Sequence, residues 1–209
     1  MLGTHDLGLF ITTGLVLNLT PGVDMLYTIS RTAQGGWRSG LAAAAGICAG
    51  CVVHTLAAAL GLAALLSTSP LAFNAVKWVG AAYLLWLGAG MLRTAWRGAP
   101  AVAALALAPA STARVFRQGF VTNVLNPKVA LFFMALLPQF IDTAAPHKTA
   151  AFLFLGAVFI VNGFVFLCVL VALVARLRTL RASARAARVL QAAGGTLFVA
   201  LAARLAAAR

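Results

Sequence analysis

Two charged residues lie inside long apolar stretches, each shortly after a proline. Asp24 follows Pro21 in the run NLTPGVD, and Lys128 directly follows Pro127 in the run NVLNPKVAL. Asp24 is one of only three acidic residues in this chain of 209. A charge at membrane depth costs roughly 2.5–3.5 kcal/mol on insertion scales, so it is by default a candidate functional group. Because a carboxylate can take up a proton or bind an amine, and an ammonium can bind a carboxylate, these residues predict a site for a polar solute, a proton or both.

Each proline also predicts a break in its helix. Proline lacks a backbone N–H and frees a carbonyl one turn earlier, and in transporters such carbonyls and half-helix ends bind substrates or coupling ions. A structural kink without a site is the alternative interpretation. The predicted substrate or proton-coupling site consists of the residues at the two breaks: Asn18, Thr20, Pro21, Gly22, Asp24, Asn123, Asn126, Pro127 and Lys128. Asp24 and Lys128 either pair directly or share a polar cavity; the alternative is that Asp24 merely faces a cytoplasmic vestibule.

The elements that carry these residues are predicted to be membrane-spanning helices. Hydrophobic residues make up 63% of the chain, charged residues make up 9%, and the mean hydropathy is +0.99, whereas a soluble domain has about 25% charged residues. Helices are required because lipid cannot satisfy exposed backbone polar groups. With about 20 apolar residues per span, we expect one all-α, polytopic transmembrane domain over residues 1–209, with six spans at about 7–30, 40–66, 71–92, 116–140, 149–175 and 189–207.

The distribution of basic residues predicts the orientation of these spans. The net charge is +13, and eleven of the sixteen basic residues lie in the connections after the first, third and fifth spans: Arg31, Arg38, Arg93, Arg97, Arg114, Arg117, Arg176, Arg178, Arg181, Arg185 and Arg188. Cytoplasmic connections carry the excess of Lys and Arg, so both termini are predicted to be periplasmic. This arrangement explains the basic charge without a nucleic-acid partner. The first ten residues contain no Lys or Arg, which indicates a retained span rather than a signal peptide.

An uncharged, Ala- and Pro-containing segment divides the chain into two halves. Repeat one covers about 5–97, a cytoplasmic linker covers about 98–113, and repeat two covers about 114–209. Three spans in each half place the two halves in opposite orientations. The halves also share a short pattern, in which Phe10 and Phe116 each precede the break proline by 11 residues. Antiparallel halves with matching breaks predict an inverted-repeat transporter.

The second predicted span contains the pair Cys48-x-x-Cys51. Membrane thiol–disulfide carriers use cysteine pairs, but such pairs react most readily at a helix N-terminus. This pair lies well inside its helix, which favours a packing role. Gly46 and Gly50 on the same helix predict a close-packing face. His54, one turn later, is either a proton relay or a hydrogen-bonded structural residue.

Three blocks of the sequence resemble the LysE-type amino-acid exporters, in their RhtB branch of homoserine/threonine-type efflux proteins. They are NLTPGVD at 18–24, KWVGAAYLLWLGAGMLR at 77–93 and FRQGFVTNVLNPKVALFFMALLPQFID at 116–142. The resemblance implies a bacterial inner-membrane exporter of amino acids or close derivatives, an antiporter driven by the proton gradient, and a possible homodimer. It also implies a role for Asp142, such as an outer-gate contact, for which a solvated carboxylate is the simpler alternative. Val23 departs from the pattern, because the family commonly has a second proline there.

These patterns predict a secondary transporter rather than an enzyme, because no nucleophile, base and orienting group occur together. The expected partners are an amino-acid-like solute, protons and the lipid bilayer, with no organic cofactor and no metal. Asn162 in the fifth span either lines the cavity or forms an interhelical hydrogen bond. A thiol–disulfide carrier using Cys48 and Cys51 is the alternative function. A metal-ion exporter comes third, because one carboxylate and one histidine, His54, make a poor ligand set for a divalent cation.

Overall fold

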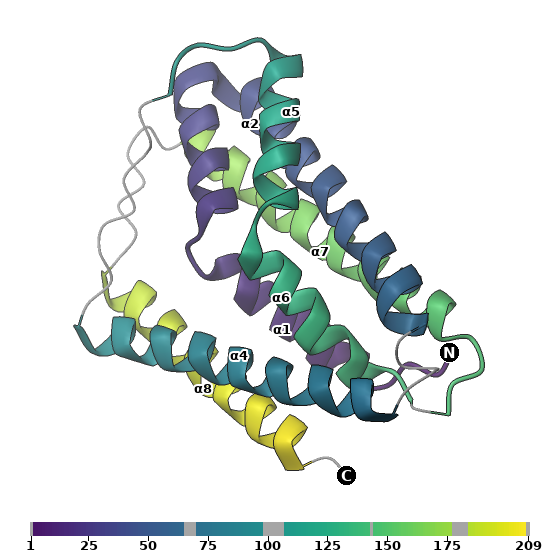
Figure 1. The fold of residues 1–209 in the computed structure, drawn as a ribbon. Helices are drawn as coiled ribbons and strands as arrows, with labels where there is room; N and C mark the ends of the chain where they lie inside the picture. The colour runs from purple at the N-terminus through teal and green to yellow at the C-terminus, as the bar shows by residue number, and fades with distance from the viewer. Residues whose placement is uncertain (1, 65–69, 98–106, 143, 177–183, 208–209) are drawn as a thin grey trace.

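The computed structural model describes residues 2–64, 70–97, 107–142, 144–176 and 184–207, and their regular structure is helical (Figure 1). The elements are α1 (Leu7–Leu19), α2 (Val23–Ala57), the π-helix η1 (Ala58–Leu62), α4 (Pro70–Arg97), α5 (Thr112–Val124), α6 (Pro127–Leu136), the 3-10 helix η2 (Leu137–Phe140), α7 (Lys148–Arg176) and α8 (Ala184–Ala207). An isolated β-bridge joins Thr4 to Ile141. The predicted all-α class is confirmed for the described residues.

Several of these helices are long and apolar enough to cross a membrane. Val23–Leu62, Asn74–Arg97 and Lys148–Arg176 each meet this requirement, and α5 with α6 and η2 forms a fourth candidate whose halves meet at a bend of 50°. The helix α1 and the segment Gln191–Ala207 are apolar but shorter. By length and composition, the described residues thus contain three or four candidate spans, and the six-span count stays a prediction. Most of the predicted linker, residues 98–106, lies outside the described residues.

The connection expected between the first two spans, residues 31–39, is mostly helical. The helix α2 runs through it, and only Gly36 leaves the helical conformation, with φ 70° and ψ −172°. Glycine adopts positive φ without the steric cost that a side chain brings, so a single residue lets the chain change direction. Figure 1 shows α2 turning back on itself beside the start of α5.

The helices α2 and α5 pack closely because glycines on each face the backbone of the other. A Cβ added at Gly46 would collide with the Phe116 carbonyl, and one at Gly119 would lie 2.8 Å from a backbone carbonyl of α2. A Cβ at Gly50 would lie 2.8 Å from the Asn123 side chain. The predicted close-packing face of Gly46 and Gly50 is confirmed, and it places α2 directly against the helix that carries Asn123.

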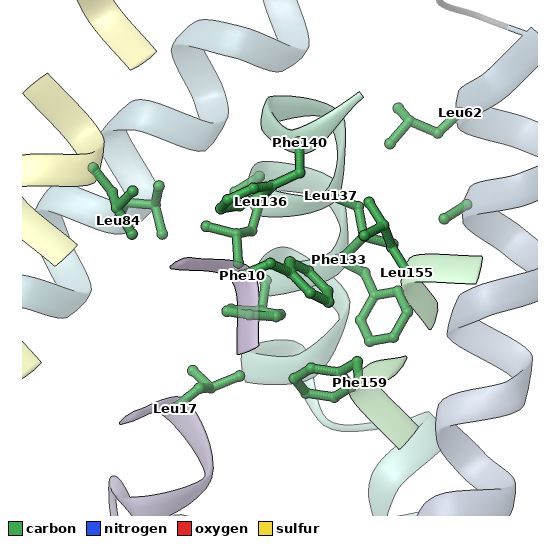
Figure 2. Packing of buried hydrophobic residues seen from close by; sticks show 14 of the residues in the cluster. Phe10, Leu17, Leu62, Leu84, Phe133, Leu136, Leu137, Phe140, Leu155 and Phe159 are labelled. Atoms are coloured by element: carbon green, nitrogen blue, oxygen red, sulfur yellow. The ribbon is translucent and has the colours of Figure 1, made fainter. Parts of the chain in front are cut away.

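The larger apolar cluster surrounds α6 and η2. Phe10 of α1 packs edge-on against Phe140 of η2, and Phe133 of α6 packs in the same way against Phe159 of α7, with ring centroids 5.2 Å apart in both pairs. Figure 2 shows these side chains converging between α1 and α7. The helix α4 packs mainly along α8, on the other side of α6 from α2 and α7 (Figure 1). This core fixes the position of α6, and therefore of the residues at its first turn.

Candidate functional site

Both predicted helix breaks are present. Residues 20–22 separate α1 from α2, and residues 125–126 separate α5 from α6. Asn126 caps α6, since its Oδ1 accepts a hydrogen bond from the Lys128 backbone N–H at 3.0 Å. Pro127 occupies the first helical position, where the missing N–H leaves no hydrogen bond unmade. The second break is therefore a helix end followed by a capped helix start, not a gentle kink.

Asp24 links the first break to the second. It lies in the first turn of α2, where the helix dipole favours a carboxylate. Its Oδ2 accepts hydrogen bonds from Asn123 Nδ2 at 2.9 Å and from Asn126 Nδ2 at 3.0 Å. Its Oδ1 is buried and has no hydrogen-bond partner among the described residues. One oxygen holds the carboxylate in place, and the other remains available.

Lys128 links the second break back to the first. Its Nζ donates hydrogen bonds to Leu17 O at 2.9 Å and to Thr20 O at 2.8 Å. Both carbonyls lie at the end of α1, where main-chain acceptors outnumber the intrahelical donors; Leu17 O also accepts from the Thr20 backbone N–H at 3.2 Å. The ion pairs within 4.0 Å in the described part of the chain do not include Asp24 with Lys128. Asp24 and Lys128 thus line one polar cavity without pairing directly.

A cavity of about 560 Å³, measured together with its opening to solvent, lies beside the two breaks. Seven of the nine residues predicted from the breaks line it: Asn18, Thr20, Gly22, Asp24, Asn123, Asn126 and Lys128. Pro21 and Pro127 do not line it. Their role is to interrupt the main-chain hydrogen bonds of the two helices. The structure thus brings together polar residues that lie about a hundred positions apart in the sequence.

Three polar side-chain atoms in the cavity wall are buried without a hydrogen-bond partner in the described part of the chain. They are Asn18 Nδ2, Asp24 Oδ1 and Asn123 Oδ1. Buried polar atoms are nearly always paired, and leaving one unpaired costs about 1–3 kcal/mol. One unpaired donor and two unpaired acceptors on residues that line a cavity fit a site that binds a polar ligand.

The helix α7 contributes a set of apolar residues to the wall, whereas the sequence had named only Asn162 of this helix as a possible cavity residue. Its lining residues are Phe159, Ile160, Gly163, Phe166 and Leu167. Their spacing of one, four, seven and eight residues from Phe159 marks a single helical face. These side chains carry no chemistry of their own, so this spacing is the one signal that could have identified them.

The cysteine pair also contributes to the wall. Cys48 and Cys51 both line the cavity, and both are free thiols. Cys51 belongs to the buried apolar core, whereas Cys48 is half-buried. Their position agrees with the packing role favoured by the sequence, and it adds small side chains that leave room for a ligand.

The remaining candidates lie outside the cavity wall. His54 Nε2 forms a hydrogen bond of 3.0 Å with the backbone oxygen of Asn123, so it supports the end of α5. Asn162 Nδ2 donates to a backbone carbonyl of α1 at 3.0 Å, which is the interhelical role. Asp142 has 61% of its side chain exposed and lies 3.9 Å from His5 near the N-terminus.

Comparison with known families decides what kind of protein has this arrangement. The sequence matches the model of the LysE type translocators over residues 15–209, which includes both breaks and every residue of the cavity wall. The chain belongs to the LysE-type translocator family. The family predicted from the sequence blocks is thereby confirmed, and this LysE-type chain is a membrane transport protein rather than an enzyme.

Related LysE-type proteins match nearly the whole chain. A homoserine/homoserine lactone efflux protein of Salmonella typhimurium is 35% identical over 201 residues, which are 96% of this chain and 95% of the relative. A leucine efflux protein of Enterobacter sp. is 32% identical over 205 residues, or 98% and 96% of the two chains. An uncharacterized membrane protein of Pseudomonas aeruginosa is 35% identical over 159 residues, or 75% and 74%. No solved structure matches the chain.

These relatives place the LysE-type chain in a family of amino-acid efflux transporters. Nothing in the comparisons supports the two alternative functions, a thiol–disulfide carrier or a metal-ion exporter. The named relatives are also informative about the cavity, because their names give solutes whose functional groups can be compared with the groups left unpaired in its wall.

Proposed function

We propose that this chain exports a neutral amino acid or a close derivative across the bacterial inner membrane in exchange for protons, as an antiporter of the RhtB type. The observation that carries the proposal is the set of three buried, unpartnered atoms in the cavity wall. Asp24 Oδ1 and Asn123 Oδ1 are acceptors that suit the ammonium group of an amino acid. Asn18 Nδ2 is a donor that suits its carboxylate.

The solutes in the names of the relatives support this assignment. Homoserine, homoserine lactone and leucine share an ammonium-bearing carbon next to a carbonyl carbon, although their side chains differ. The lactone lacks a free carboxylate but keeps a carbonyl oxygen. An ammonium held by Asp24 and Asn123, with a carboxylate oxygen at Asn18, suits the two zwitterionic solutes, homoserine and leucine.

The charges in the wall favour a solute without net charge. Asp24 and Lys128 are the ionisable acid and base at the breaks, and their charges balance. A solute with a net charge would bring an unpaired charge into a buried site, which costs several kcal/mol. Phe159, Ile160 and Leu167 offer apolar surface for an aliphatic side chain, as ligand sites commonly do.

Asp24 is the proposed coupling residue. A carboxylate binds an ammonium through its negative charge, and it loses that charge when it takes up a proton. Proton and solute therefore alternate at Asp24 Oδ1 during exchange. Asp24 is the only acidic residue in the cavity wall, since Asp6 and Asp142 lie in a separate cluster with His5.

The proposal includes six spans arranged as two inverted repeats of three, with both termini in the periplasm, and it allows a homodimer. Its support is the bias of basic residues and the two matching breaks. On each of the two expected sides of the membrane, residues assigned to that side also contact one another. Arg204 and Asp6 form an ion pair at 2.7 Å, and Arg31 donates to Gln118 at 2.7 Å.

Transport in proteoliposomes tests the proposed function. An acidic interior drives the uptake of labelled leucine or homoserine by a proton antiporter, whichever way the protein is inserted. We expect uptake that a protonophore abolishes and that unlabelled neutral amino acids inhibit, but that lysine and glutamate do not. Folded protein that moves neither solute under a pH gradient would contradict the proposal.

A further inference from the structure

The ammonium of Lys128 lies at a position where a helix end attracts a cation. The last carbonyls of an α-helix have no internal donors, and the helix dipole gives this end about half a negative charge. Lys128 Nζ lies 2.8 Å from Thr20 O and 2.9 Å from Leu17 O at the end of α1, where Leu17 O also accepts from the Thr20 backbone N–H at 3.2 Å. It donates to these two main-chain oxygens instead of forming an ion pair with Asp24, the acidic residue of the same cavity.

In transporters built from broken helices, unwound carbonyls and half-helix C-termini coordinate soluble coupling cations such as Na⁺. The end of α1 has the same components, two converging carbonyl oxygens at a break, but a side chain already occupies it. We propose that the Lys128 ammonium is a tethered cation that fills a monovalent-cation site at the C-terminus of α1. Its occupation by the protein itself makes the transporter independent of Na⁺.

Two hydrogen bonds fix the main chain of Lys128, as a tethered ammonium requires. Its backbone N–H donates to Asn126 Oδ1 at 3.0 Å, and its carbonyl accepts a hydrogen bond from Tyr83 Oη at 3.0 Å. The first contact belongs to the cap of α6, and the second comes from α4. The ammonium is thus anchored in the second break while it binds the first, so the two breaks are held together by a cation that cannot leave.

A permanent cation has a consequence for the exchange cycle. If a soluble cation bound at α1, its arrival and departure would change the charge of the cavity and would couple its gradient to export. The tethered ammonium keeps that charge constant. The proton and the solute at Asp24 are then the only ligands whose binding alternates. This inference about the cycle rests on the proposed function, whereas the binding test below does not.

Thermal unfolding of the purified protein in detergent tests the cation site without any transport assay. The salts are sodium, methylammonium and choline chloride at equal ionic strength, since choline is too large for the site. A ligand that binds only the folded state raises the midpoint of unfolding. We expect the unmodified protein to unfold at the same temperature in all three salts.

The variant Lys128→Ala should unfold several degrees lower in choline, and sodium or methylammonium should restore much of the loss. Lys128→Met, which fills the space without a charge, should lose stability in every salt and regain none. Lys148→Ala is the control, because Lys148 also donates to the main chain, but to one carbonyl, Ala145 O at 3.5 Å, in a loop rather than at the end of a helix. It should respond equally to all salts.

Two results would overturn the inference. One is a Lys128→Ala variant with the same unfolding temperature in sodium, methylammonium and choline. The other needs no variant: the unmodified protein would be stabilised by sodium, or its export would depend on sodium. Because unfolding is measured without solute, a failure of the cation site is distinguishable from a failure of the proposed export function.

Discussion

Asp24 is the residue at which the geometry and the proposed chemistry meet. Its two oxygens are used differently, since Oδ2 accepts from Asn123 and Asn126 while Oδ1 is buried in the cavity wall without a partner. An unpaired carboxylate oxygen is costly unless a proton or a ligand satisfies it. The asymmetry of the two oxygens therefore supports a carboxylate that is held in place by the protein and exchanges its second partner.

Asp24→Asn tests this role. The amide keeps the shape of the side chain and an oxygen for Asn123 and Asn126, but it cannot carry a proton through the cycle. We expect normal protein levels, loss of net export driven by a pH gradient, and partial survival of passive exchange of labelled solute. Export in proteoliposomes is the measurement, with Asp142→Asn, an exposed carboxylate outside the cavity, as the control. Asp24→Asn with undiminished proton-dependent export would show that Asp24 is only a charge near the cavity.

Asn18→Ala tests the donor proposed for the carboxylate or carbonyl of the solute. Loss of one hydrogen bond to a charged group removes about 1.5–3 kcal/mol, so the KM for leucine should rise roughly tenfold to a hundredfold. Asn162→Ala is the matched control, because Asn162 bonds a carbonyl of α1 and does not line the cavity. It should lower thermal stability and leave KM unchanged. Equal KM changes in the two variants would rule out a direct contact at Asn18.

At the scale of the elements, the site depends on short distances between helices. The cavity needs Asn123 of α5 next to Asp24 of α2, and this proximity depends on the glycines between the two helices. Gly46 and Gly50 bring the backbone of α2 against α5, and Gly119 does the same from α5. Small residues at such contacts allow close approach in membranes, where burial of apolar surface from water gives no driving force.

Gly46→Ala should therefore destabilise the protein. Its methyl group would collide with the Phe116 carbonyl, and overpacking of this kind costs typically 1–3 kcal/mol. Gly90→Ala is the control, because a Cβ at Gly90 meets nothing within 4 Å. We expect a lower unfolding midpoint in detergent for Gly46→Ala, and no decrease for Gly90→Ala. Equal midpoints would mean that α2 and α5 are free to separate.

For the whole molecule, the contacts divide the loops and helix ends into two groups. Asp6 contacts Arg204, and the N-terminal segment pairs with the end of η2 through Thr4 and Ile141. The second group lies near the interruption of α2 at Gly36, where Arg31 of α2 donates to Ala108 O at 2.8 Å. From the bias of basic residues, we propose that this second group, which contains Arg31, lies in the cytoplasm.

Reporter fusions test the assignment. Fusions after Arg97 and after Arg185 should report a cytoplasmic location, and a fusion after Arg209 should report a periplasmic one. The physical reason is that connections rich in Lys and Arg are retained in the cytoplasm. A cytoplasmic report after Arg209 would mean that α8, whose apolar segment Gln191–Ala207 is short, does not cross the membrane.

Many local features of this protein could be predicted from its residues alone. Its composition required helices in lipid, because no other local structure satisfies the backbone there. Pro21 and Pro127 located the two breaks, because proline removes the donor that a continuous helix needs at each point. Asp24 was identified as a candidate because an isolated carboxylate in an apolar stretch is costly. These inferences rest on single residues and their nearest neighbours in the chain.

Which groups meet depends on how the helices pack in the folded chain. Lys128 binds Leu17 O and Thr20 O rather than Asp24, because a long, flexible side chain binds whichever acceptors the packed helices bring within its reach. Phe159 and Gly163 complete the cavity from α7, although apolar residues in an apolar helix give no local sign of a site. The two breaks form one site because the close packing of α2 against α5 sets the distance between them, and that distance is a property of the folded chain.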